Sequence, residues 1–153
     1  MLLRVDFNVP MQDGKVADAT RIERALPTIK ALTERGAKVA LLSHFGRPKK
    51  AAPDPAYSLR PVAEKLSELL GAPVSFAEDC VGVVAQRVID PLRDGAVAVL
   101  ENTRFHAGEE ANDRDFIAAL AANGDLFVND AFSAAHRAHA STEGLAHALP
   151  AAA

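Results

Sequence analysis

The sequence of 153 residues lacks the features that mark several classes of protein. Its single cysteine, Cys80, excludes a disulfide framework and a cysteine-based zinc site within one chain. A net charge of -3 argues against a general nucleic-acid binder, which would carry an excess of basic residues. No apolar run approaches the roughly 20 residues that span a bilayer, and charged residues follow Met1 too soon for a signal peptide. We therefore expect a cytoplasmic protein that binds neither nucleic acid nor membrane.

Two common phosphate-binding loops are also missing. The chain contains no Gly-x-x-x-x-Gly-Lys-Ser/Thr loop and no Gly-x-Gly-x-x-Gly after a predicted strand. Nothing in the sequence therefore predicts a site for a nucleoside triphosphate.

What is present is the alternation typical of an α/β domain. Short apolar segments alternate with stretches of helical periodicity, which predicts a three-layer, mostly parallel sheet with helices on both faces, as in Rossmann-like folds. The expected strands cover residues 2–7, 38–43, 74–76, 96–101 and 125–129. The expected helices cover residues 26–35, 59–70, 80–88 and 114–122.

Local signals set several of these boundaries. Pro27 suits the first turn of the first helix, Ser58 is a good N-cap for the second, and Gly36 and Gly71 end them. Asp13-Gly14 predicts a tight turn, and the composition of residues 46–57 predicts a mobile surface loop.

The first strand begins at the first residue, and the chain stops directly after a helical pattern, so we expect truncation at both ends.

The candidate site follows from where the polar residues fall. In open α/β sheets, ligands bind beyond the carboxyl ends of the strands. Four of the expected strand ends carry arginine, histidine, acid or amide side chains, and one arginine lies just ahead of the first helix. These residues are Asp6, Asn8, His44, Arg47, Asn102, Arg104, His106, Asn129, Asp130, His136, Arg137, His139 and Arg21.

This gathering of arginines predicts a small, multiply charged anion as the ligand. Arginine pairs bidentately with carboxylate or phosphate and stays charged at any physiological pH. Strand alternation places Asp6 and Asn8 on the same side, with Phe7 opposite. Their hydrogen-bond acceptors and donors could bind a hydroxyl of the ligand. Arginine has no acceptor and could not do this alone.

Each residue has a simpler interpretation when it is taken singly. One arginine is more often a solvated or salt-bridged surface residue, and Asp6 with Asn8 can close a strand-end turn. His136 and His139 suggest zinc, but no third ligand is evident and their neighbours are arginines, so we expect no metal. Cys80 begins an expected helix, where its pKa could fall, although a plain buried thiol is the preferred interpretation. Only the convergence of positions supports the anion site.

Four segments together resemble phosphoglycerate kinases. They occur in that family's order and with compatible spacing over essentially the whole chain, and four such matches are far more specific than one. Small departures occur at Phe45, Ala107 and Ser133-Ala134, and none removes a proposed contact. The segments are Arg4-Val5-Asp6-Phe7-Asn8-Val9-Pro10, Ser43-His44-Phe45-Gly46-Arg47-Pro48, Glu101-Asn102-Thr103-Arg104-Phe105-His106 and the run from Asn129-Asp130-Ala131-Phe132 to His139-Ala140-Ser141-Thr142.

The resemblance implies a two-lobed glycolytic enzyme, of which residues 1–153 form the N-terminal, glycerate-binding lobe. Such enzymes transfer a phosphoryl group between 1,3-bisphosphoglycerate and ADP, giving 3-phosphoglycerate and MgATP. The C-terminal lobe, which holds MgATP or MgADP, is absent from this chain, so the lobe alone is expected to be inactive. The family is generally monomeric.

The resemblance also implies roles for individual residues. Asp6 and Asn8 would contact the hydroxyl end of the glycerate. Arg21 would lie by the carboxyl group that accepts or gives the phosphoryl, and is the candidate catalytic residue. The non-transferring phosphate would be held by His44, Arg47, Arg104 and Arg137.

Two other functions fit the same residues. A stand-alone module could have kept the glycerate site for regulation or storage. A structural or interaction domain could use the arginine cluster to bind an acidic partner surface, and would then have no specific affinity for 3-phosphoglycerate.

Overall fold

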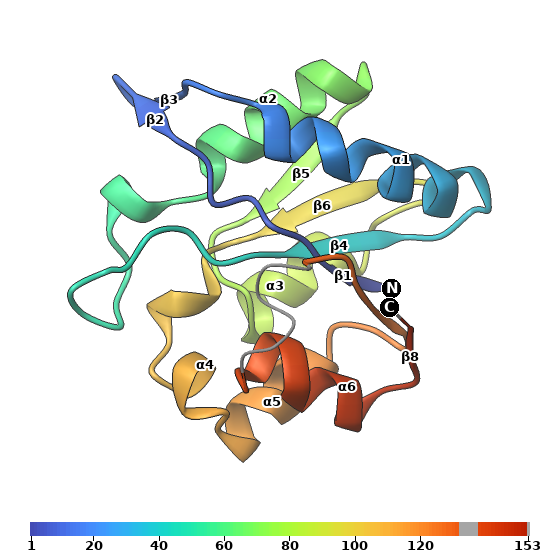
Figure 1. Cartoon of the computed structure of the whole chain (residues 1–153). Coiled ribbons are helices and arrows are strands. Elements are labelled where there is room, and N and C mark those ends of the chain that lie inside the picture. The colour runs from blue at the N-terminus through green and yellow to red at the C-terminus, as the bar shows by residue number, and fades with distance from the viewer. Residues whose placement is uncertain (132–137, 153) are drawn as a thin grey trace.

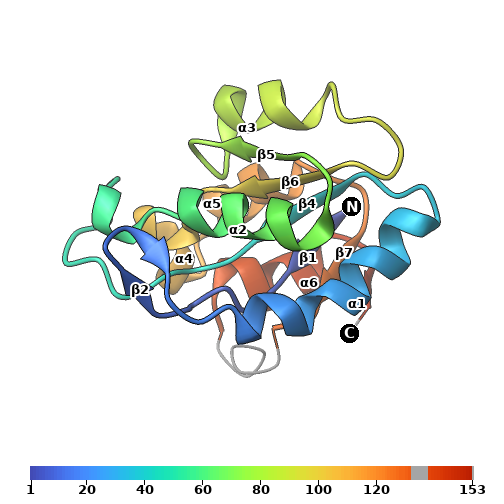
Figure 2. The same cartoon turned by 90° about the horizontal axis from the view of Figure 1, so that it is seen from above.

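The computed structural model describes residues 1–131 and 138–152 (Figure 1). Within them, six parallel strands form one sheet in the order β5-β6-β4-β1-β7-β8. The view from above (Figure 2) shows β5, β6, β4, β1 and β7 side by side in that order. The strands are β1 (Leu2–Arg4), β4 (Val39–Leu42), β5 (Val74–Ala77), β6 (Val97–Leu100), β7 (Phe127–Asn129) and β8 (Ala151–Ala152).

Helices cover both faces of this sheet, which confirms the predicted three-layer α/β fold (Figure 1). On one face lie α1 (Thr20–Glu34) and α2 (Arg60–Leu70). The opposite face carries α3 (Gly82–Ile89), α5 (Arg114–Ala121) and α6 (Leu145–Ala148). Shorter elements complete the chain, namely the 3-10 helices Pro55–Tyr57 and Thr103–Phe105, the helix α4 (Gly108–Ala111) and the π-helical segment η4 (Ala140–Gly144).

Two hydrophobic cores follow from the alternation of side chains along the central strand. Leu3 and Val5 face α1 and α2, whereas Leu2 faces α5 and α6. Burying one such aliphatic side chain contributes about 1.5–3 kcal/mol. The first core also contains Phe7, Ile22, Ile29, Leu41, Val62, Leu66 and Val99, and the second contains Leu42, Leu100, Phe116, Leu120, Phe127 and Leu145.

The start of α1 was predicted wrongly. The helix begins at Thr20, whose backbone N–H and hydroxyl both donate to Asp18, at 2.9 and 2.6 Å. Pro27 therefore lies inside the helix and not in its first turn. It sits on the exposed side, while Ile22 and Ile29 are fully buried on the other. Burial of that apolar face keeps the helix continuous past a proline that would otherwise disfavour it.

Other boundaries differ by smaller amounts. The residue that precedes α2 is Leu59, one position later than the predicted cap Ser58, although the Ser58 hydroxyl does accept a hydrogen bond from the N–H of Arg60 at 3.2 Å. The Asp13-Gly14 turn is present, and it joins a small antiparallel pair, β2 (Met11–Gln12) and β3 (Lys15–Val16). No strand was predicted at β8. None of the helices in the described part of the chain combines the length and the apolar character of a membrane-spanning segment.

Candidate functional site

The topology makes one edge of the sheet a candidate ligand site. β1 connects through α1 to its neighbour β4, whereas β7, on the other side of β1, connects through α6 to β8. The connections that follow these two adjacent strands therefore cross opposite faces of the sheet, since α1 lies on one face and α6 on the other. Open α/β sheets bind ligands at such a switch point, outside the carboxyl ends of the strands.

Three of the predicted site residues meet at the end of β1. The guanidinium of Arg21, in the first turn of α1, donates through Nη1 to the Asn8 carbonyl at 2.7 Å and lies 3.3 Å from the Asp6 carboxylate. The Asp6 carboxylate also accepts the backbone N–H of Asn8 at 3.1 Å, closing the strand-end turn. A cavity of about 540 Å³ opens beside this group, lined by Asn8, Val9, Pro10, Asp18, Thr20, Arg21 and Arg24.

A second set of contacts joins the ends of β1, β4 and β6. The Asn8 side-chain oxygen accepts the backbone N–H of Gly46 at 3.0 Å. The carbonyl of Gly46 accepts a hydrogen bond from Arg104 Nη1 at 3.1 Å. Arg104 is largely buried, and its Nε lies 3.9 Å from the Glu110 carboxylate. Gly46 therefore lies between Asn8 and Arg104 and couples the two.

His44 is held by an arginine that the sequence reasoning did not assign to the site. The Arg4 guanidinium is fully buried, and its Nη2 lies 2.7 Å from His44 Nδ1. Arg4 also donates through Nη1 to the Val5 carbonyl at 2.6 Å and through Nε to the Ser141 hydroxyl at 2.9 Å. A charged residue inside an otherwise apolar strand was the signal that could have identified it.

Ser141 carries the Arg4 contact on to a buried carboxylate. Glu109, in α4, accepts the Ser141 hydroxyl at 2.6 Å and the Ser141 backbone N–H at 2.7 Å. Burial lowers the pKa of the Arg4 guanidinium, while the nearby carboxylates of Glu109 and Asp6 oppose that change. Arginine nevertheless stays protonated in proteins. The buried positive and negative groups thus lie at the two ends of a short hydrogen-bonded chain.

Two buried polar residues that follow β6 shape the loops around the site. The amide of Asn102 accepts from the N–H of Phe45 at 3.2 Å and donates to the Phe45 and Tyr57 carbonyls at 2.8 and 3.0 Å. Glu101 accepts the N–H of Leu59 at 2.8 Å and the Ser58 hydroxyl at 2.6 Å, and so caps α2 from a distant strand. Neither structural role is predicted from the sequence.

The remaining predicted residues are placed differently. Arg47 is exposed, next to Gly46 in the chain. His136 and Arg137 lie outside the described residues, so the predicted contribution of Arg137 stays a prediction. The structure thus brings together Asp6, Asn8 and Arg21, links Arg104 to them through Gly46, and connects His44 to the same strand end through Arg4.

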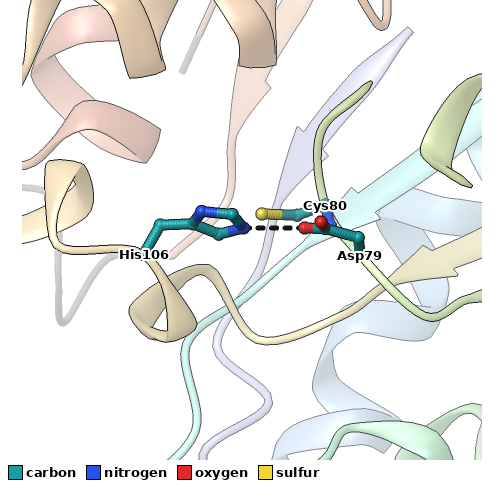
Figure 3. A group of neighbouring side chains, drawn as sticks. All are labelled: Asp79, Cys80 and His106. Carbon is teal, nitrogen blue, oxygen red and sulfur yellow. Dashed lines mark hydrogen bonds and ion pairs between the residues drawn. The ribbon is translucent and has the colours of Figure 1, made fainter. Parts of the chain in front are cut away.

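A separate group of potential metal ligands lies at the ends of β5 and β6 (Figure 3). One ligand atom from each of Asp79, Cys80 and His106 lies within 4.8 Å of the others. A chain with one cysteine cannot build a site from several cysteines, but it can build a mixed set such as this one. Burial raises the pKa of the Cys80 thiol well above its ordinary value in the metal-free chain. His106 Nε2 is instead 2.7 Å from Asp79, and its ring stacks on Phe116. These contacts join the segments that follow β5 and β6 to α5, which is a structural role for the group.

The arrangement at the end of β1 is suited to binding a small anion and holding it in one orientation. It offers guanidinium groups from α1 and from the end of β6, a histidine from the end of β4, and an acid and an amide from the end of β1. No nucleophile with a neighbouring base lies among the described residues of this group, so its contribution is charge and position.

Comparisons with known proteins identify the family of the chain. The family model described as phosphoglycerate kinase matches residues 1–153. Curated phosphoglycerate kinases from Methylorubrum extorquens and Caulobacter vibrioides are 64% and 66% identical over 151 residues, which is 99% and 98% of this chain. The chain spans 38% of the length of each of these relatives.

Solved structures of two phosphoglycerate kinases are similar in fold. The enzyme from Coxiella burnetii aligns with a TM-score of 0.87 over 98% of this chain and 37% of its own, at 40% identity. The enzyme from Pyrococcus horikoshii aligns with a TM-score of 0.88 over 98% of this chain and 38% of its own, also at 40% identity.

Proposed function

Because the chain belongs to the phosphoglycerate kinase family, we propose that it forms the lobe of such a kinase that binds 3-phosphoglycerate or 1,3-bisphosphoglycerate. The reaction is the reversible transfer of a phosphoryl group between 1,3-bisphosphoglycerate and ADP. The observation that carries the proposal is the meeting of Asp6, Asn8 and Arg21 beside an open cavity, at the switch point of the sheet.

The proposed roles divide the ligand between two groups of residues. Asp6 and Asn8 bind the hydroxyl end, and Arg21 lies by the carboxyl group that gives or accepts the phosphoryl. Arg21 uses Nη1 for both of its protein contacts. A guanidinium carries five N–H donors, so it can bind the ligand without releasing the strand end. The non-transferring phosphate is bound by His44, Arg47, Arg104 and Arg137.

This division of roles is what phosphoryl transfer requires. The attacking oxygen of a carboxylate or of ADP is already ionised, so the protein supplies position and positive charge, and no general base is needed. Arg21 stabilises the charge that develops on the transferring group, and the other basic residues orient the ligand. MgATP or MgADP is bound by the C-terminal lobe, so the 153-residue chain alone is inactive.

Calorimetric titration of the 153-residue chain with 3-phosphoglycerate, and separately with MgADP, tests the proposal. We expect binding of 3-phosphoglycerate and none of MgADP. The variant Arg104→Met should weaken binding, because it removes a charge that is held beside Gly46. Arg87→Met, on the exposed side of α3, is the matched control and should bind as the unaltered chain does.

The same titration separates the competing functions. An interaction domain that uses its arginines for an acidic protein surface would show no saturable affinity for 3-phosphoglycerate. Binding of MgADP with comparable affinity would contradict the assignment of the nucleotide to the other lobe.

A further inference from the structure

The geometry points to Arg4 as a positioning residue, which holds His44 as the neutral tautomer with its proton on Nε2. In this state His44 can meet an anion only as a hydrogen-bond donor. That the anion is the phosphate of a phosphoglycerate rests on the proposed function. The tautomer itself rests only on contacts within the chain.

The contact between the two side chains is short and inaccessible to water on the arginine side. Arg4 is 0% exposed, and its Nη2 lies 2.7 Å from His44 Nδ1. The two residues come from neighbouring strands, since Arg4 ends β1 and His44 follows the end of β4. The parallel pairing of β1 and β4 therefore sets this separation.

The chemistry of the pair permits one arrangement. A guanidinium has N–H donors and no acceptor, so the nitrogen that faces it must accept. Nδ1 is therefore unprotonated, and the neutral ring carries its proton on Nε2. An imidazolium would point a second N–H at the guanidinium and bring two positive charges within 2.7 Å. The contact therefore selects both the tautomer and the neutral state.

Arg4 cannot easily turn away from His44, because its other nitrogens are held in different directions. Nη1 donates to the Val5 carbonyl at 2.6 Å, and Nε donates to the Ser141 hydroxyl at 2.9 Å. Ser141 is fixed in turn by two hydrogen bonds to Glu109, of 2.6 and 2.7 Å. Among the described residues, Glu109 and Asp6 favour the positive charge of Arg4, and Arg104 opposes it.

This arrangement gives His44 a function that a free histidine would not have. A histidine with an ordinary pKa exists near pH 7 as a mixture of two neutral tautomers and a cation. Only the neutral form with its proton on Nε2 both accepts from Arg4 and donates to a phosphate oxygen. Arg4 thus prepares the donor before the ligand arrives, which lowers the cost of ordering it on binding.

Long-range ¹H–¹⁵N spectra of the ligand-free chain test the tautomer directly. The chain has five histidines, and the signals of His44 are identified by their loss in His44→Gln. At about pH 7.5, above the ordinary pKa of histidine, we expect Nδ1 to resonate as an unprotonated nitrogen and Nε2 as a protonated one. A proton on Nδ1, or averaged signals for the two nitrogens, would overturn the inference.

Two variants show whether Arg4 is the cause. Arg4→Met removes the donor. The double variant Arg4→Met with Glu109→Gln removes both buried charges, so it leaves no unpaired buried carboxylate and can be used if the single variant does not fold. In either variant we expect the His44 signals to move to averaged positions. Glu109→Gln alone keeps Arg4 and is the control. Unchanged tautomer signals in the double variant would show that Arg4 does not set the tautomer.

Binding of 3-phosphoglycerate tests the use of the donor. Glutamine at position 44 places an N–H near the position of Nε2, whereas asparagine places an acceptor near that of Nδ1. We expect His44→Gln to bind more tightly than His44→Asn by about 10-fold, in line with a hydrogen bond to a charged group. The reverse order would overturn the donor role. Absence of any binding by the unaltered chain would instead contradict the proposed function and leave the tautomer result standing.

Discussion

The side-chain oxygen of Asn8 accepts the backbone N–H of Gly46 at 3.0 Å, which ties the end of β1 to the loop after β4. The carbonyl of the same glycine accepts Arg104 at 3.1 Å. Gly46 has a φ of +61°, and a Cβ placed there would lie 2.6 Å from the ring of Tyr57. A residue without a side chain is therefore required where these strand ends meet.

Replacing Gly46 by alanine should destabilise the chain and weaken the site. The left-handed backbone and the clash with Tyr57 both oppose the added methyl group, and we expect a loss of roughly 2 kcal/mol in urea denaturation. Gly36→Ala is the matched control, because Gly36 also has a positive φ but no atom within 4 Å of the added Cβ. Equal losses in the two variants would show that contact with Tyr57 does not matter.

Arg21→Ala should reduce turnover more than it reduces affinity for 3-phosphoglycerate, when measured in a full-length kinase that carries this lobe. Arg21 is assigned to the transferring group, so its loss should lower kcat by roughly 10²–10³-fold, as for other groups that stabilise developing charge. Arg87→Ala, which alters an exposed arginine of α3 away from this cavity, is the control. Equal reductions of kcat and affinity by Arg21→Ala would contradict the catalytic role.

Glu101→Ala should destabilise the fold through the start of α2. The Glu101 carboxylate accepts the buried N–H of Leu59 at 2.8 Å, and removing it leaves this donor without its acceptor. An unsatisfied buried donor costs about 1–3 kcal/mol, which denaturation with urea would detect. Glu64→Ala, on the exposed side of α2, should change the free energy of unfolding by less than about 0.5 kcal/mol. An equally small change in the free energy of unfolding for Glu101→Ala would contradict the proposed capping role of Glu101.

Cys80 should make stability fall at alkaline pH. Burial raises the pKa of this thiol in the folded chain, so the folded state keeps a proton that the unfolded state releases. The resulting stabilisation is complete below the unfolded pKa of about 8.5 and is lost as the pH rises above it. We expect the free energy of unfolding to decline above about pH 9 more steeply in the unaltered chain than in Cys80→Ala. Parallel pH profiles, or rapid reaction of the native thiol with Ellman's reagent, would contradict this.

The elements with a clear hydrophobic pattern were predicted well from the sequence, and their boundaries were predicted less well. Five strands were found because strands covered on both faces are almost continuously apolar, as in β4 and β6. The start of α1 is not predictable from Pro27, because burial of Ile22 and Ile29 sustains the helix on both sides of this proline. β8 cannot be predicted from the sequence, because two alanines carry no hydrophobic pattern and form a strand only by pairing with β7.

For the site, the sequence by itself determined which residue types gather at the strand ends. The reason is that the strands run parallel, so all of their carboxyl ends lie at one edge of the sheet. It also carried the motifs that identify the family. Only the tertiary structure decided which of these residues touch. The Arg4–His44 contact joins residues 40 positions apart, and the Arg4–Ser141 contact joins residues 137 apart. Such partners depend on the register of neighbouring strands and on the packing of η4 against α4, which local periodicity does not encode.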